Sequence, residues 1–369
     1  LSIVRGTWGL CVLFEDYDYV LCARNGSPLI IGRGENEMFI SSDPHAIREH
    51  TSQLVALEDG QIAKLDSNTF QVMKTDGKEV ESVPLLLEEE WGESELGDYP
   101  HFMLKEIHEQ SQSLQHCISG RLRNSEGTSV LGGLQIQPHD LAQLPHVRLI
   151  GCGTALHAAQ IGQILIEHWA RIPAVSHVAS EFNANDPVVN PQALHLAISQ
   201  SGETADTLSA VKEIQRKGAD VYGIVNVVGS SIARQCGKGV YIHSGPEQSV
   251  ASTKAFTNMV GALALFSLQL GRSRHLSKTK GQSIIREMRK LPDKIRTYLE
   301  NPGPIKEAVD MITQAKSVLF LGRGISSPVA SEGALKLMEI AYIPCLAYPA
   351  GEMKHGPIAL IDENYPVVV

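Results

Sequence analysis

The stretch Ser199-Gln200-Ser201-Gly202-Glu203-Thr204 is the part of this sequence that most restricts its fold. It follows the apolar run of residues 193–198 and precedes a helical pattern through Leu208, Val211 and Ile214. A strand should therefore end here and a helix begin. The first N–H groups of a helix lack helical partners and carry partial positive charge, so they stabilise an anion. With three hydroxyls and an amide alongside, the stretch predicts a phosphate site; the alternative is a simple capping box that uses Glu203.

The sequence around this stretch alternates strands and helices. Apolar runs at residues 147–150, 193–198, 221–225 and 240–242 are separated by glycine turns and by enough residues for a helix. Alternation of this kind predicts an α/β fold with a parallel sheet covered on both faces. Ligands of such sheets bind at the carboxyl ends of the strands, which is where residues 199–204 are expected.

An internal repeat lies at an offset of 171 residues. Residues 147–173 align without gaps on residues 318–344, with Gly151 on Gly322 and Gly153 on Gly324. Two copies of one α/β domain are therefore expected, joined by a helical stretch over residues 282–316. The same offset places residues 194–198 on residues 365–369, so we expect the second copy to be incomplete and the chain to be truncated there. A strand already under way near Leu1 predicts the same of the N-terminal end.

The first part of the chain has a different pattern. Short apolar runs at residues 9–14, 19–23, 29–31, 38–40, 54–57 and 70–73 are separated by turn residues, which predicts mostly antiparallel β structure. Residues 86–100 are acidic and are expected to form a solvated connector. Helical periodicity over residues 101–120 aligns Met103, Ile107, Leu114 and Ile118 in one apolar stripe.

The composition excludes several classes of protein. The 369 residues carry a formal net charge of −9 and no basic face, which argues against a nucleic-acid partner. No apolar run reaches the ~20 residues that span a bilayer, and no secretory leader is visible, so we expect a cytoplasmic protein without a membrane partner. Six scattered cysteines without a CxxC pair suggest neither a disulfide framework nor a zinc site.

Two glycine turns resemble dinucleotide fingerprints but lack the third glycine. Leu156 and Ser327 occupy that position in the two copies, which disfavours a nicotinamide enzyme. Residues 247–257, Glu-Gln-Ser-Val-Ala-Ser-Thr-Lys-Ala-Phe-Thr, combine small and hydroxylated side chains. Such a run suits a loop that closes over a sugar, and the alternative is a capped helix that starts near Ser252.

The helix expected over residues 328–342 carries Glu332, Lys336 and Glu339 on one face. The first copy of the repeat has Ile161, Leu165 and His168 at the matching positions. These charges form either a surface ion-pair stripe or a base and a cation that face a cleft. His355 lies between two glycines of a loop, where it could approach a substrate and titrate near neutral pH, although a lone histidine is more often structural.

Taken together, these motifs resemble the glutamine:fructose-6-phosphate amidotransferase family, also called glucosamine-6-phosphate synthases. The resemblance rests on residues 152–154 (Cys-Gly-Thr), residues 199–207 (Ser-Gln-Ser-Gly-Glu-Thr-Ala-Asp-Thr), residues 250–256 (Val-Ala-Ser-Thr-Lys-Ala-Phe), residues 332–336 (Glu-Gly-Ala-Leu-Lys) and residues 351–357 (Gly-Glu-Met-Lys-His-Gly-Pro). Residues 24–32 and residues 105–110 (Lys-Glu-Ile-His-Glu-Gln) extend it over nearly the whole chain.

The resemblance implies the domains. Residues 1–90 are expected to be the end of an Ntn-type glutaminase domain, residues 91–125 a linker and the start of the isomerase half, residues 126–283 a first sugar-isomerase (SIS) domain, and residues 284–369 a second, truncated one. Both SIS domains should contain parallel sheets.

The resemblance also implies the chemistry. It predicts glucosamine 6-phosphate formation from fructose 6-phosphate and glutamine, in amino-sugar (UDP-GlcNAc) biosynthesis, by a cytoplasmic homodimer without cofactor or metal. Ser199, Gln200, Ser201 and Thr204 would hold the phosphate, and Thr154, Val250 and Ser252 would contact the sugar. Glu339 would shuttle a proton between C1 and C2, Lys336 would lie beside it, and His355 would open the sugar ring from a neighbouring subunit.

The sequence departs from the family pattern in three ways. The N-terminal nucleophilic cysteine is absent, and the Schiff-base lysine would lie beyond Val369, so we expect no glutaminase activity and deficient amino transfer. Ala155 replaces the usual serine, which removes one phosphate hydroxyl and puts affinity in question. The alternatives are another SIS sugar-phosphate deglycase or isomerase and a non-catalytic sugar-phosphate-binding regulator.

Overall fold

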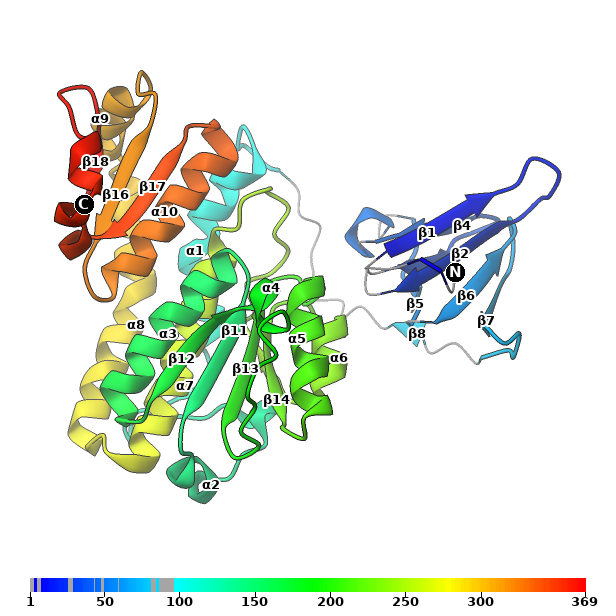
Figure 1. The fold of residues 1–369 in the computed structure, drawn as a ribbon, viewed down its shortest axis with the longest axis horizontal. Coiled ribbons are helices and arrows are strands. Elements are labelled where there is room, and N and C mark those ends of the chain that lie inside the picture. The colour runs from blue at the N-terminus through cyan, green and yellow to red at the C-terminus, as the bar shows by residue number, and fades with distance from the viewer. Residues whose placement is uncertain are drawn as a thin grey trace.

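The N-terminal part of the chain is a β-rich block. The computed structural model describes residues 3–4, 8–25, 29–42, 44–47, 50–58, 60–80, 84–85 and 96–369. One antiparallel sheet has the order β1-β2-β6-β7, and a second has the order β4-β3-β5-β8 (Figure 1). Their elements are β1 Trp8–Leu13, β2 Val20–Asn25, β3 Ile30–Arg33, β4 Met38–Ser41, η1 Pro44–Ile47, β5 Gln53–Ala56, β6 Gln61–Leu65, β7 Phe70–Lys74 and β8 Pro84–Leu85.

Side chains from both sheets form the core of this block. Cys22 and Ala63 of the first sheet and Ile31 and Val55 of the second belong to one buried cluster. The predicted antiparallel β block is therefore confirmed, although β6 and β8 were not among the expected strands. Most of the predicted acidic connector, residues 86–95, lies outside the described residues.

A helix and a short hairpin follow the β block. They are α1 Phe102–Ile118, β9 Leu122–Arg123, β10 Thr128–Ser129, η2 Gly132–Leu134 and α2 Pro138–Gln143. The helix predicted over residues 101–120 is confirmed, and Leu114 and Ile118 are buried as its stripe requires. Glu106 is also buried, which the apolar stripe did not predict.

A five-stranded parallel sheet forms the centre of the next unit, with strand order β12-β11-β13-β14-β15. Its elements are β11 Val147–Gly151, α3 Thr154–Ala170, β12 Ala174–Val178, α4 Ala179–Phe182, β13 Leu194–Ser199, α5 Ala205–Arg216, β14 Val221–Val225, α6 Ser231–Cys236, β15 Gly239–Tyr241 and α7 Lys254–Arg274. The predicted parallel sheet is confirmed, and β12 adds an edge strand that the apolar runs did not indicate.

Helices cover both faces of this sheet (Figure 1). On one face, Leu149 and Leu196 pack with Ala158 of α3 and Leu263 of α7. On the other face, α4, α5 and α6 pack against alternate residues such as Ile150 and Ala197. Consecutive residues of one strand thus enter two cores, which is the pattern of a strand buried on both sides.

Two helices lead from this unit to a second, smaller one. They are α8 Lys278–Glu300 and α9 Gly303–Ile312, so the predicted helical connection is confirmed. A three-stranded parallel sheet of order β17-β16-β18 follows, with the elements β16 Val318–Gly322, α10 Ser326–Ala341, β17 Cys345–Pro349, η3 Ala350–His355, η4 Pro357–Leu360 and β18 Val367–Val368. None of the helices formed by the described residues is both long and apolar enough to cross a membrane.

The backbone reproduces the internal repeat residue by residue. Strands β11 and β12, moved by the offset of 171, coincide with β16 and β17. Arg171 and Tyr342, which close the two equivalent helices, have left-handed φ angles of 57° and 55°. The two units therefore share the same strand–helix–strand arrangement. Helices α3 and α10 pack directly against each other.

Candidate functional site

The carboxyl ends of β11 and β13 are the place where a ligand of the first sheet is expected. The chain passes from β11 to β12 on one side and then places β13 on the other side, so the strand order reverses between β11 and β13. The two strands pair in parallel register through Ile150 and Ala197, and therefore end at the same edge. Ligands of open α/β sheets bind at such a reversal. Residues 199–204 and the start of α3 both lie there.

Residues 199–204 form a polar turn that we call the cradle. Ser199 Oγ lies 2.9 Å from Thr204 Oγ1 and accepts a hydrogen bond from the Gly202 N–H at 3.0 Å. Ser201 Oγ accepts one from the Glu203 N–H at 3.1 Å. Thr204 is the residue before α5 but makes no side-chain capping bond, so the first turn of that helix keeps its N–H groups available. The cradle therefore presents hydroxyls and helix donors to an anion.

The capping-box alternative for this turn is wrong. Glu203 does not cap α5; its Oε1 accepts a hydrogen bond from the Ser231 N–H at 2.8 Å, at the start of α6. Gly202 has φ +66°, and a Cβ there would lie 2.5 Å from Ser230 Cβ. The turn is thus fastened to α6 and requires glycine at its centre.

A buried carboxylate joins the two repeats at the start of α3. Glu332 of α10 is 6% exposed. Its Oε1 accepts a hydrogen bond from Thr154 Oγ1 at 2.9 Å, and its Oε2 lies 2.7 Å from His157 Nδ1. Lys336 Nζ donates to Thr154 Oγ1 at 3.1 Å and lies 3.4 Å from the Glu332 carboxylate. The surface-stripe reading of the charges on α10 is wrong for these two residues.

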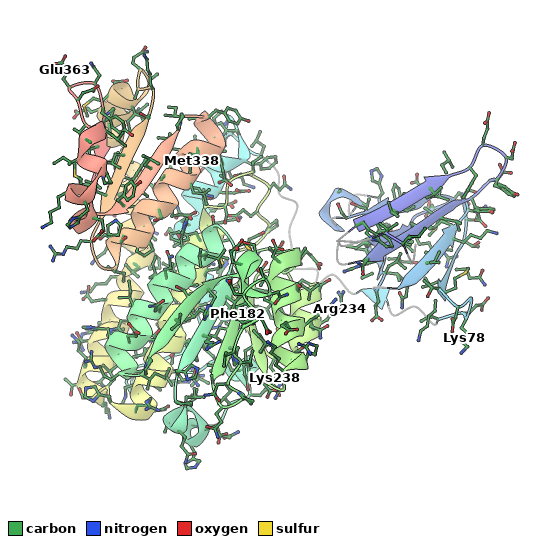
Figure 2. All side chains as sticks on the ribbon, viewed as in Figure 1. Lys78, Phe182, Arg234, Lys238, Met338 and Glu363 are labelled. Atoms are coloured by element: carbon green, nitrogen blue, oxygen red, sulfur yellow. The ribbon has the colours of Figure 1, made fainter. Side chains whose placement is uncertain are left out.

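Glu339 continues the same network by one turn of α10. Its carboxylate lies 2.7 Å from Lys336 Nζ and is about one-third exposed. Met338, its neighbour in the sequence, is labelled on α10 in Figure 2. Lys336 therefore stands between Thr154 of the first unit and Glu339 of the second. A partly exposed carboxylate beside a cation can exchange a proton with a substrate that reaches it.

Val250 and Ser252 lie on the loop between β15 and α7. Val250 is 86% exposed, and the Ser252 hydroxyl donates to Glu247 Oε2 at 2.8 Å. Glu247 Oε1 also accepts from the Thr253 and Ala255 N–H groups at 2.8 and 3.1 Å. The predicted helix near Ser252 begins at Lys254, and Glu247 rather than a serine satisfies its first donors.

His355 ends η3 and is exposed. No hydrogen bond or ion pair joins it to Lys336 or Glu339 in the part of the chain that the structure describes. The second unit therefore pairs two of its three predicted catalytic residues, Lys336 and Glu339, and His355 takes no part in that ion pair. Gln200 is partly buried in the cradle, where its backbone carbonyl accepts a hydrogen bond from the backbone N–H of Asn226 at 3.1 Å.

Sequence reasoning missed two residues of this region. His157 lies one turn after Thr154 on α3, and this spacing was the available signal. Asn226, 2% exposed, follows β14 and connects the cradle with the loop after β15. Its side chain accepts from the Ser244 N–H and donates to the Gly245 carbonyl at 2.9 and 2.8 Å. In the described residues no cluster of three His, Cys, Asp or Glu side chains could hold a metal ion.

Known proteins resemble this chain in its SIS regions and over its whole length. The model of the SIS domain family matches residues 140–268 and 311–369. Proteins named glutamine–fructose-6-phosphate aminotransferase (isomerizing) align with all of this chain, at 45% identity in Thermus thermophilus and in Chlorobaculum tepidum. The chain spans 61% and 60% of their lengths, respectively.

Solved structures agree with the fold. The C-terminal domain of glucosamine-fructose-6-phosphate aminotransferase from Francisella tularensis is 35% identical, with a TM-score of 0.70 over 74% of this chain and 76% of that one. Tagatose-6-phosphate ketose/aldose isomerase from Escherichia coli, 17% identical with a TM-score of 0.59 over 73% of this chain and 72% of that one, shares the fold.

Proposed function

The chain belongs to the SIS-domain family, within the group of glutamine–fructose-6-phosphate aminotransferases, and on this basis we propose that it serves the conversion of fructose 6-phosphate and glutamine to glucosamine 6-phosphate. The observation that carries the proposal is that β11 and β13, a neighbouring parallel pair, end at the same edge of the sheet. The cradle follows β13, and the Thr154–Lys336–Glu339 network begins at the start of α3, directly after β11. A phosphate site and an acid–base pair at one edge of a sheet suit the two ends of a sugar phosphate.

The cradle is proposed to hold the phosphate. The hydroxyls of Ser199, Ser201 and Thr204, the amide of Gln200 and the first N–H groups of α5 would donate to it. Anions are stabilised at such a helix terminus because several oriented N–H groups point at them. Thr154, Val250 and Ser252 would then contact the sugar, with the loop after β15 covering it.

Glu339 is proposed to move the proton that converts a ketose imine into an aldose amine. The carboxylate would take a proton from C1, and the same group would return a proton to C2. Lys336 would hold the carboxylate in place through their 2.7 Å contact, while its link to Thr154 fixes the ammonium relative to the first unit. His355 is proposed to assist ring opening from the other subunit of a homodimer, since it is exposed and takes no part in the Lys336–Glu339 ion pair of its own chain.

The β-rich block is proposed to belong to a glutaminase domain that supplies the amino group. We also propose a cytoplasmic location and a role in the route to UDP-GlcNAc.

The direct test is an assay of the protein expressed from its gene with fructose 6-phosphate and glutamine. We expect glucosamine 6-phosphate, detected by mass spectrometry, and no product when glutamine and ammonia are both left out. An isomerised sugar phosphate without amino transfer would instead favour a SIS isomerase or deglycase. Binding of the sugar phosphate without any conversion would favour a regulator.

A further inference from the structure

Residues 105–110 form a motif for which the proposed chemistry gives no role. They lie on α1, far from the cradle in sequence, and include Glu106, which is 1% exposed. A carboxylate is rarely buried in a protein unless it is paired or hydrogen-bonded, because its desolvation is costly. Burial raises the pKa of Glu106, and the hydrogen bonds that it accepts act in the opposite direction. Polar contacts must therefore offset the desolvation cost of burying the Glu106 carboxylate.

The compensation comes from the backbone of the loop after β15. Glu106 Oε1 accepts hydrogen bonds from the Gln248 N–H at 2.6 Å and from the Ser249 N–H at 3.1 Å. Residues 242–253 contain no helix or strand, so these N–H groups have no ladder partner. One side chain of α1 thus satisfies two successive donors directly before Val250.

Two further residues of α1 hold the other end of the loop. Glu109 Oε2 lies 2.6 Å from Nζ of Lys254, which is itself 4% exposed. Gln110 Oε1 accepts from Thr257 Oγ1 at 2.7 Å. Residues 106, 109 and 110 share one helix face, and their contacts bracket the segment that carries Val250 and Ser252.

We infer that Glu106 is a positioning residue that holds the loop of residues 247–253 in the shape needed to bind the sugar part of a sugar phosphate. This inference rests on the proposed function of the loop. Without Glu106 the Gln248 and Ser249 N–H groups lose their acceptor, and binding must then order the loop as well as the ligand, which lowers affinity. The cradle is tied to α6, and its link through Asn226 reaches Ser244 and Gly245, which precede the segment that Glu106 holds. We therefore expect its affinity for phosphate alone not to depend on Glu106.

The test compares Glu106→Ala, Glu106→Gln and the matched control Gln112→Ala, an exposed residue of the same helix. Titration calorimetry with fructose 6-phosphate is run beside titration with inorganic phosphate. We expect Glu106→Ala to lower the affinity for fructose 6-phosphate by about 10-fold, the cost of two lost hydrogen bonds. The affinity for inorganic phosphate should stay within about 2-fold of the parent. Glu106→Gln keeps an acceptor oxygen and should restore most of the affinity, and Gln112→Ala should match the parent.

The outcomes separate the two proposals. A parent protein that binds neither ligand overturns the proposed function and this inference with it. A parent that binds both, with Glu106→Ala binding fructose 6-phosphate equally well, overturns the inference alone. An equal loss for both ligands also overturns it, because that is the signature of general damage. Should Glu106→Ala fail to fold, Glu106→Asp takes its place: it keeps the charge but is too short to reach both amides, and parent-like affinity in it contradicts the inference.

Discussion

The Glu332 carboxylate of α10 lies 2.7 Å from His157 Nδ1 of α3, although 175 residues separate the two in the sequence. The pair joins the second repeat to the first, and both side chains are largely buried. The Thr154 hydroxyl, which donates to Glu332, ties the same carboxylate to the mouth of the crevice. The relative position of the two repeats is therefore set next to the residues proposed to act on the sugar.

Removing Glu332 should destabilise this interface. The Glu332→Ala substitution leaves the imidazole and a hydroxyl without their buried acceptor, and we expect it to lower the free energy of unfolding by about 3 kcal/mol, measured by urea titration. Glu287→Ala, which removes two ion pairs between side chains more than half exposed on α8, is the matched control and should cost less than about 0.5 kcal/mol. Equal losses in the two variants would refute a special role for the buried carboxylate.

The cradle should not tolerate a side chain at Gly202. Its φ of +66° and the overlap of a new Cβ with Ser230 predict that Gly202→Ala moves the turn. The affinity for fructose 6-phosphate, measured by calorimetry, should then fall at least about 10-fold. Gly218→Ala is the control, because Gly218 also has a positive φ, +86°, but open space around it. That variant should bind normally and lose only about 1 kcal/mol of stability. Normal binding by Gly202→Ala would show that the cradle does not hold the phosphate.

Glu339→Gln should separate chemistry from binding. The amide keeps the size of the side chain but cannot shuttle a proton, so product formation should fall about 100-fold or more while the affinity for fructose 6-phosphate changes little. Rates from a coupled assay and affinities from calorimetry measure the two effects. Full activity in this variant would show that another group carries the proton.

The free energy of unfolding should decrease as the pH is lowered from neutral, because of His195. This residue of β13 is fully buried, and burial, together with electrostatic repulsion from Arg148 and His146 nearby, lowers its pKa from 6.5 to about 4. The unfolded chain takes up this proton below pH 6.5, whereas the folded chain does so only near pH 4. The stability is therefore complete above pH 6.5 and is lost as the pH falls toward 4, by about 3 kcal/mol in total.

Urea titrations between pH 7 and pH 4.5 test this origin. His195→Gln has no imidazole to protonate and should show a flatter dependence on pH than the parent. The same substitution at His275, which is exposed, should leave the parent's dependence in place. An unchanged slope in His195→Gln would assign the effect to other groups.

Much of the architecture was predictable because the sequence repeats itself. An offset of 171 residues predicted two copies of one α/β unit, and the ends of β11 and β16 obey it. The edge strand β12 was missed because its Ser176 and His177 interrupt the apolar run from which a buried strand is recognised. Similarly, β6 contains Lys64, which points to solvent between two buried residues.

The sequence allowed the residues of the candidate site to be proposed, but not their contacts. Hydroxyls after a strand are a local pattern, so the turn of residues 199–204 could be recognised from the sequence. The burial of Glu332 was not predictable, because a glutamate on a helix is usually exposed and its partner His157 comes from another helix. The same holds for Glu106, whose partners are backbone groups more than 140 residues away.

A crystal structure of the protein with fructose 6-phosphate tests the central claim most directly. We expect the phosphate oxygens within hydrogen-bond distance of Ser201 and Thr204 in the cradle, and the C1–C2 end of the sugar beside Glu339. A sugar phosphate bound at another place, with the cradle left empty, would contradict the account.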